Sequence, residues 1–164
     1  HRRMLQDIRT VNRKIHAILS GTSADSEWGI SMGSLAVRAF VAEHDSCVDM
    51  LIVCGSPSYN TAMPLGVAIA KTEKAVFGPR HRSKLIETMS FGAGAMKFRK
   101  DKRCTAWICS DPDVAKEYEE SEMCGFTFTD DAYLALFELM KRAYDVEHFS
   151  CTNPDMPVLF VSGG

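Results

Sequence analysis

The stretch Gly29-Ile30-Ser31-Met32-Gly33 follows the pattern G-x-S-x-G, and it decides how the rest of the chain is interpreted. A serine flanked in this way suits a very sharp turn from a strand into a helix, where a strained backbone pushes the hydroxyl outward. Glycine at both flanking positions leaves room for the strand and the helix to pass closely. The five residues also occur together by chance, and an ordinary helix N-cap at Ser31 is the alternative interpretation.

The segments around the pentapeptide predict an alternation of helices and strands. Apolar residues at helical spacing indicate an amphipathic helix over residues 1–20, and a second helix runs from Ser34 to about His44. The apolar runs Val48–Cys54 and Pro157–Val161 are each followed by small, turn-forming residues. Such runs are typical of strands that are buried on both faces of a parallel sheet.

The chain between these two apolar runs is helical by pattern. Four helices are predicted, at Leu65–Val76, Arg82–Met89, Pro112–Glu120 (with Asp111 as its N-cap) and Ala132–Tyr144. Breaks are predicted at Gly78-Pro79, Gly92-Ala93-Gly94 and Cys124-Gly125. The order predicts an α/β fold in which residues 1–58 and 156–164 form parts of a parallel-sheet core. Residues 59–155 then form an inserted helical lid.

The composition narrows the class of protein. At 164 residues and 46% hydrophobic residues the chain can bury one core, and its net charge of −2 argues against nucleic acid as a partner. The six cysteines show no Cys-x-x-Cys spacing, so we expect reduced thiols in a cytoplasmic protein and no metal site. The chain has no apolar stretch long enough for a transmembrane segment. It begins without Met inside a helical pattern, so we expect a fragment of a longer protein.

The order of these motifs resembles the α/β-hydrolase family, in particular its monoacylglycerol lipase and lysophospholipase branch with serine aminopeptidase-like members. Residues 29–34, GISMGS, are similar to that branch's G-H-S-M-G-S. The strand ending at residues 52–56 resembles the core strand after which the family inserts a helical lid. Residues 107–111 and 124–129 are similar to lid segments of bacterial members, and residues 159–163 resemble the strand that leads to the acid-bearing turn.

The resemblance implies a role for each part of the serine site. Ser31 is the expected nucleophile, and the backbone N–H of Met32 is the expected oxyanion donor. The acid and the histidine of the triad are expected beyond Gly164, so this fragment alone is expected to be inactive. His44 and His148 could replace the missing base by residue type, but a solvated structural role is expected for both. The basic stretch at residues 80–82 is expected on a solvated face.

Two features depart from the family pattern. The family usually has histidine at the position of Ile30, and its strand before the serine is apolar. This chain has the polar stretch Ala24-Asp25-Ser26-Glu27-Trp28 there. A central strand would bury these polar groups at a cost of several kilocalories per mole. We interpret the stretch as a sign that residues are missing between the first helix and Trp28.

Together these inferences predict a serine hydrolase that cleaves a carboxylic ester of an apolar acyl chain, such as a monoacylglycerol or a lysophospholipid, through an acyl-enzyme at Ser31. Apolar side chains of the predicted lid are candidates for lining the acyl pocket: Met89, Phe91, Met96, Phe98, Trp107, Met123, Phe126 and Phe128. The chemistry needs no cofactor, and contact with a membrane surface is expected to be transient. Two alternatives stay open: a non-catalytic hydrolase-fold protein that binds a ligand or partner, and a proline-releasing serine aminopeptidase.

Overall fold

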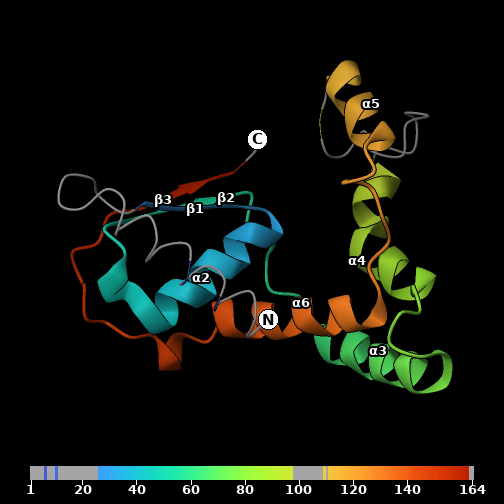
Figure 1. Cartoon of the computed structure of the whole chain (residues 1–164), viewed down its shortest axis with the longest axis horizontal. Coiled ribbons are helices and arrows are strands. Elements are labelled where there is room, and N and C mark those ends of the chain that lie inside the picture. The colour runs from blue at the N-terminus through green and yellow to red at the C-terminus, as the bar shows by residue number, and fades with distance from the viewer. Residues whose placement is uncertain (1–5, 7–9, 11–25, 98–108, 110, 163–164) are drawn as a thin grey trace. The chain divides into compact units, whose positions relative to one another are not determined.

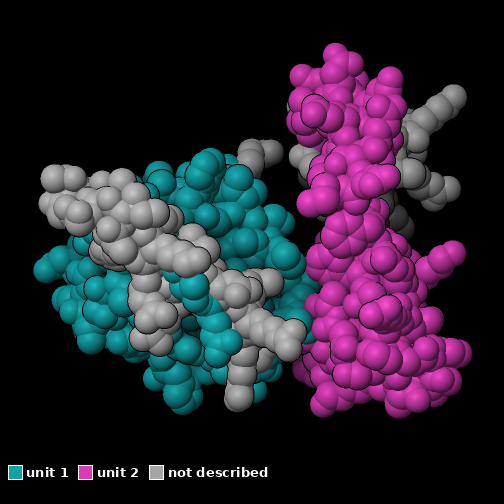
Figure 2. Space-filling model, in the orientation of Figure 1, with its two compact units in different colours: residues 1–61, 135–164 teal, residues 62–134 magenta. Residues whose placement is uncertain are grey.

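The computed structural model describes residues 6, 10, 26–97, 109 and 111–162, and for residues 93–97 it describes the backbone (Figure 1). The chain divides into two compact units, one formed by residues 1–61 and 135–164 and the other by residues 62–134 (Figure 2). The predicted helix over residues 1–20 lies outside the described residues, apart from two helical positions. The assignment of residues 59–155 to a lid stays a prediction.

A three-stranded parallel sheet forms the centre of the first unit. Its strands are β1 (Ser26–Ile30), β2 (Met50–Cys54) and β3 (Val158–Val161), in the order β1-β2-β3. The register pairs Ile30 with Cys54 and Cys54 with Val161, so the carboxyl ends of all three strands are level. The predicted parallel pairing of the two apolar runs is therefore confirmed.

The described part of the polar stretch before Ser31, residues 26–28, lies in strand β1. Ser26 lies opposite Met50 and Glu27 opposite Leu51 in the ladder with β2. Ser26 is exposed and Glu27 is half-buried, so the burial cost expected for these polar groups does not arise among the described residues. Whether residues are missing before Trp28 stays a prediction, because residues 11–25 lie outside the described part of the chain.

Helix α2 (Met32–His44) confirms the helix predicted after the pentapeptide and packs against β1 and β2. Its buried residues make up most of its length: Ser34, Leu35, Ala36, Val37, Ala39, Phe40, Val41 and Ala42. In β2, Leu51 and Val53 are buried while the alternate residues are half-buried. The residues of β3 are all exposed, so the prediction that this strand is buried on both faces is wrong for the described structure. An apolar run predicts a strand, but it does not specify which elements cover the faces of that strand.

A buried carboxylate fixes the segment that leads into β3. Asp45, in the 3₁₀ turn η1 (Asp45–Cys47), accepts hydrogen bonds from the backbone N–H groups of Thr152 (2.6 Å) and Asn153 (2.9 Å) and from the Thr152 hydroxyl. Burial by itself raises the pKa of Asp45, but these hydrogen bonds and one from Ser150 lower it to about 2. The carboxylate therefore stays ionised and holds the loop of residues 150–153 against the end of α2.

The second unit is helical, as predicted. It contains α3 (Met63–Phe77), α4 (Lys84–Lys97), α5 (Pro112–Glu120) and the start of α6 (Asp130–Ala143), which continues into the first unit and is followed by the 3₁₀ turn η2 (Val146–His148). The predicted N-cap of α5 is confirmed, because the Asp111 carboxylate accepts from the backbone N–H groups of Asp113 (2.9 Å) and Val114 (3.4 Å). None of the described helices is long and apolar enough to span a membrane.

The predicted breaks at glycine are confirmed at two places and wrong at one. Gly78 (φ 91°) and Gly125 (φ 65°) have positive φ values, which glycine adopts readily because it has no side chain. The Gly92-Ala93-Gly94 break is wrong, because α4 runs through it to Lys97. Glycine lowers helix stability by only about 1 kcal/mol relative to alanine, so neighbouring helical residues can carry the helix across it.

Candidate active site

Ser31 sits in a strained turn between β1 and α2. Its backbone has φ 51° and ψ −117°, and Ser31 is the described residue other than glycine that has a positive φ. Residues other than glycine rarely adopt this backbone conformation, and the strain costs on the order of 1–3 kcal/mol of stability. The turn persists because the Ser31 N–H donates to the Cys54 carbonyl (2.9 Å), which ties it to the end of β2.

The Ser31 hydroxyl does not act as a helix cap. The Ser31 side chain makes no capping hydrogen bond to α2. The start of the helix is anchored instead by the backbone N–H of Ser34, which donates to the Ser31 carbonyl (3.0 Å), and by the Ser34 hydroxyl, which donates to the same oxygen. The geometry therefore argues against the N-cap interpretation, and it leaves the exposed hydroxyl of Ser31 available for chemistry.

The two glycines of the pentapeptide have different roles. A Cβ on Gly29 would lie 2.4 Å from the Gly33 carbonyl oxygen and 2.7 Å from the Ser34 nitrogen, both backbone atoms that cannot move aside. A Cβ on Gly33 would meet nothing within 4 Å. The prediction that both glycines are needed for close passage is thus right for Gly29 and wrong for Gly33.

The serine turn lies at the carboxyl edge of the sheet. Ser31 follows β1, Gly55 follows β2 and Ser162 follows β3, and the level register brings these three positions to one edge. Gly55 has φ 54°, and its N–H donates to the Val161 carbonyl (2.8 Å), which closes the edge between β2 and β3. In open parallel α/β sheets this edge is where ligands bind.

Arg38 on α2 positions the loop that follows β2. Its guanidinium donates to the Ser56 hydroxyl (3.1 Å) and to the Ala143 carbonyl (2.8 Å), and it lies 4.2 Å from the centre of the Tyr144 ring. The Tyr144 hydroxyl in turn donates to the Pro57 carbonyl (2.8 Å). These contacts link α2, the end of α6 and residues 56–57, next to the edge that carries Ser31. Sequence analysis missed them because Arg38 and Ala143 are 105 residues apart and no local pattern joins them.

The start of α2 supplies the electrostatic environment of Ser31. Met32 is the first residue of the helix, where a backbone N–H has no acceptor within the helix. The positive end of the helix dipole lies at the same place and favours a negative oxygen there. The role of the Met32 N–H as oxyanion donor stays a prediction that this geometry supports.

The histidines named from the sequence are not joined to Ser31. His44 is at the opposite end of α2, about 20 Å from Ser31 at 1.5 Å per helical residue, and its ring packs edge-on against Phe40. His148 is exposed, and its Nδ1 lies 2.9 Å from an Asp145 carboxylate oxygen, a contact that raises the pKa of His148 and lowers that of Asp145. Within the described part of the chain, no hydrogen bond connects the Ser31 hydroxyl to a histidine. The identity of the triad partners of Ser31 therefore stays a prediction.

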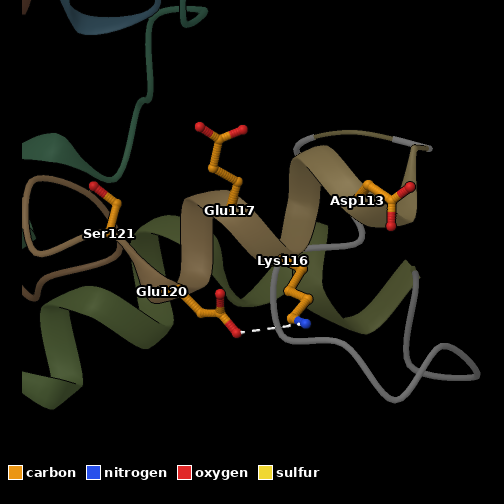
Figure 3. Close-up of a pocket in the computed structure, with 5 residues that line it drawn as sticks. All are labelled: Asp113, Lys116, Glu117, Glu120 and Ser121. Atoms are coloured by element: carbon orange, nitrogen blue, oxygen red, sulfur yellow. Dashed lines mark ion pairs between the residues drawn. The ribbon is translucent and has the colours of Figure 1, made fainter.

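A shallow hollow along α5 in the second unit does not suit an acyl ester (Figure 3). It is lined by Asp113, Lys116, Glu117, Glu120 and Ser121. Lys116 and Glu120 form an ion pair at 3.8 Å, with about two thirds of each side chain exposed. Ser121 already accepts a hydrogen bond from the Met123 N–H (3.2 Å). The hollow therefore offers a solvated, mostly acidic surface rather than an apolar pocket.

The parallel sheet, the strained serine after β1 and the helix that starts there define an α/β-hydrolase fold, present in part. The chain belongs to the serine aminopeptidase S33 family, whose sequence model matches it over residues 1–164. No curated protein sequence matches the chain significantly.

Two solved structures share the fold. A highly thermostable carboxyl esterase from Bacillus coagulans in complex with glycerol superposes with a TM-score of 0.73 at 19% identity, over 84% of this chain and 44% of the esterase. A lipase in an open form superposes with a TM-score of 0.77 at 17% identity, over 96% of this chain and 51% of the lipase. The chain thus spans about half the length of either structure.

Proposed function

We propose that Ser31 is the nucleophile of a serine hydrolase that cleaves carboxylic esters of apolar acyl chains, such as a monoacylglycerol or a lysophospholipid. The observation that carries the proposal is the geometry of Ser31, whose backbone is strained at φ 51° while its exposed hydroxyl makes no capping bond. Strain of this kind persists only where the surrounding structure holds it, and it concentrates at functional sites.

The mechanism follows from the groups around Ser31. The Ser31 oxygen attacks the ester carbonyl while a base takes its proton, and the oxyanion that forms accepts a hydrogen bond from the Met32 N–H. The intermediate then expels the alcohol, which receives the proton from the base, and leaves an acyl-enzyme. Water deacylates Ser31 in a second step by the same route. The mechanism requires a base and an orienting acid, which we propose lie outside residues 1–164.

The second unit supports an apolar substrate. Several of the side chains predicted to line an acyl pocket are exposed rather than packed in a core: Met89, Phe91, Met123 and Phe126. These side chains are therefore accessible to an apolar ligand. The two structural neighbours are a carboxyl esterase and a lipase, which agrees with ester cleavage.

A serine aminopeptidase is the second candidate, because the matching family carries that description. The two reactions share the acyl-enzyme chemistry and differ in the leaving group, which is an alcohol for the ester and an amine for the peptide. Turnover of medium-chain acyl esters and of proline-naphthylamide by the full-length protein separates them. Preference for the proline amide by more than tenfold in kcat/KM would replace the esterase proposal with the peptidase.

A fluorophosphonate probe on the full-length protein tests the nucleophile. We expect covalent labelling of the wild type, loss of labelling in Ser31→Ala, and full labelling in the matched control Ser58→Ala, which alters an exposed serine after β2. Labelling that persists in Ser31→Ala would reject Ser31 as the nucleophile. A folded wild type that does not label would support the third candidate, a non-catalytic protein that binds a ligand or partner.

A further inference from the structure

Three potential metal ligands meet in the second unit, away from the serine turn in sequence. They are Glu73 on α3, His81 in the loop after α3 and Asp130 at the start of α6, and one ligand atom from each lies within 4.8 Å of the others. His81 Nδ1 and Asp130 Oδ2 are 3.1 Å apart.

The backbone holds the three residues in place. Gly78 ends α3 with φ 91° and donates to the Lys74 carbonyl (3.0 Å), which turns the chain back toward the helix. The His81 N–H donates to the Gly78 carbonyl (3.2 Å), and the Asp130 N–H donates to the His81 carbonyl (2.8 Å). The His81 ring also stacks on Phe77 with ring centres 4.7 Å apart. The loop and the start of α6 are therefore joined directly beside the last turns of α3.

Two carboxylate oxygens of this cluster are buried without a hydrogen-bond partner among the described residues. They are Glu73 Oε2 and Asp130 Oδ1, and the Asp130 side chain is fully buried. The nearby cation Lys74 pairs with Asp131 instead, at 2.5 Å. A buried anionic oxygen without a partner costs several kilocalories per mole, so the cluster lacks positive charge.

The contact with His81 does not satisfy these two oxygens. His81 Nδ1 lies against Asp130 Oδ2, and Glu73 Oε2 and Asp130 Oδ1 have no hydrogen-bond partner among the described residues. A divalent ion, by contrast, neutralises two carboxylates and accepts a lone pair from neutral imidazole. Imidazole with carboxylates suits Zn²⁺ and its neighbours among the transition metals.

We propose that Glu73, His81 and Asp130 bind a divalent transition-metal ion of the zinc class, which ties α3 to the start of α6. Tetrahedral ligands at bonds of about 2.1 Å are about 3.4 Å apart, so ligand atoms that now lie within 4.8 Å of one another must approach by up to about 1.4 Å. Glu73 and His81 are both half-buried, which gives their side chains room to move and gives the ion a path from solvent. The proposal is independent of the reaction at Ser31.

Zinc titration of the full-length, chelator-treated protein tests the site, with Glu73→Gln and His81→Gln as the ligand variants. The matched control is His148→Gln, which removes an exposed histidine that also contacts an aspartate but belongs to no group of three close ligand atoms among the described residues. We expect one Zn²⁺ per chain in the wild type and the control, and affinity at least about tenfold lower in both ligand variants. Glu73→Gln changes a half-buried side chain on a helix, so its fold is expected to survive if His81→Gln fails to fold.

Free cysteines could also bind zinc, and cobalt substitution distinguishes thiolate ligands from the proposed nitrogen and oxygen ligands. Co²⁺ bound by nitrogen and oxygen lacks the intense charge-transfer absorption that thiolate ligands produce. We expect the nitrogen–oxygen spectrum in the wild type and its loss in Glu73→Gln. No metal binding, a thiolate spectrum, or equal affinity in the wild type and Glu73→Gln would each overturn the proposal.

Discussion

The serine turn at residues 29–34 and the cluster of Glu73, His81 and Asp130 each hold an unfavourable feature, but the kind of feature differs. In the serine turn the backbone is strained at Ser31, while its backbone N–H and carbonyl both have hydrogen-bond partners. In the cluster the polar contacts of the backbone are made, while two buried carboxylate oxygens lack partners. The strained backbone supports the proposed role of Ser31 as the nucleophile, whereas the two unpartnered oxygens support the proposed metal site.

Asp45 shows that this chain can bury a carboxylate and satisfy it. Both of its oxygens accept hydrogen bonds from residues 152–153, and like Asp130 it is buried. The contrast between these two aspartates makes the unpartnered oxygen of Asp130 informative, because burial alone does not leave a carboxylate without donors.

The largest expected effect on stability comes from Gly29→Ala. Its methyl group would overlap backbone atoms of Gly33 and Ser34, so strand and helix must separate, which costs about 3 kcal/mol or more of unfolding free energy. Gly33→Ala is the matched control, and it should raise stability by less than about 1 kcal/mol because it lies in α2 with no atom near its Cβ. Urea unfolding measures both, and equal losses would show that the close passage is not specific to Gly29.

The two buried aspartates should respond differently to neutralisation. Asp45→Asn should cost about 2 kcal/mol, because charge-assisted hydrogen bonds to Thr152 and Asn153 become neutral. In chelator-treated protein, Asp130→Asn should cost close to zero, because it removes a buried charge that lacks a full set of partners. Urea unfolding of both variants compares them. An equal loss in Asp130→Asn would mean that the cluster is satisfied without a ligand.

Acid should weaken the wild type through Asp45. The folded-state pKa of Asp45 is about 2 against an unfolded value near 3.8, so its stabilisation is fully present above pH 3.8 and is lost as the pH falls toward 2. The contribution lost is roughly 2 kcal/mol. Unfolding free energies measured at several pH values across this window should fall less steeply in Asp45→Asn than in the wild type. Parallel profiles would contradict the assignment.

The remaining expected effect is a gain of stability. Ser31→Gly should raise the unfolding free energy by about 1 kcal/mol, because glycine adopts φ 51° without the strain that a side chain imposes. The same variant should abolish fluorophosphonate labelling. Ser46→Gly, at an exposed serine whose φ is not positive, should lower stability or leave it unchanged. A loss of stability in Ser31→Gly would mean that the turn is not strained.

Local signals predicted much of the fold. The spacing of apolar residues predicted α2, α3 and α6 closely, and Asp111 before Pro112 predicted the start of α5. Local signals failed where the structure depends on neighbouring elements. Gly92 and Gly94 did not break α4. The strand β3 is exposed although its composition is apolar, because composition does not specify which elements cover a strand.

The sequence by itself determined the position of Ser31 between a strand and a helix, since a G-x-S-x-G turn is a property of consecutive residues. Only the tertiary structure decided which glycine the turn requires, because that depends on how closely β1 and α2 pass. It also decided that Arg38 meets Tyr144, and that Glu73, His81 and Asp130 share one cluster. These contacts join residues that are far apart along the chain, and a local sequence pattern does not specify which distant residues come together in the folded protein.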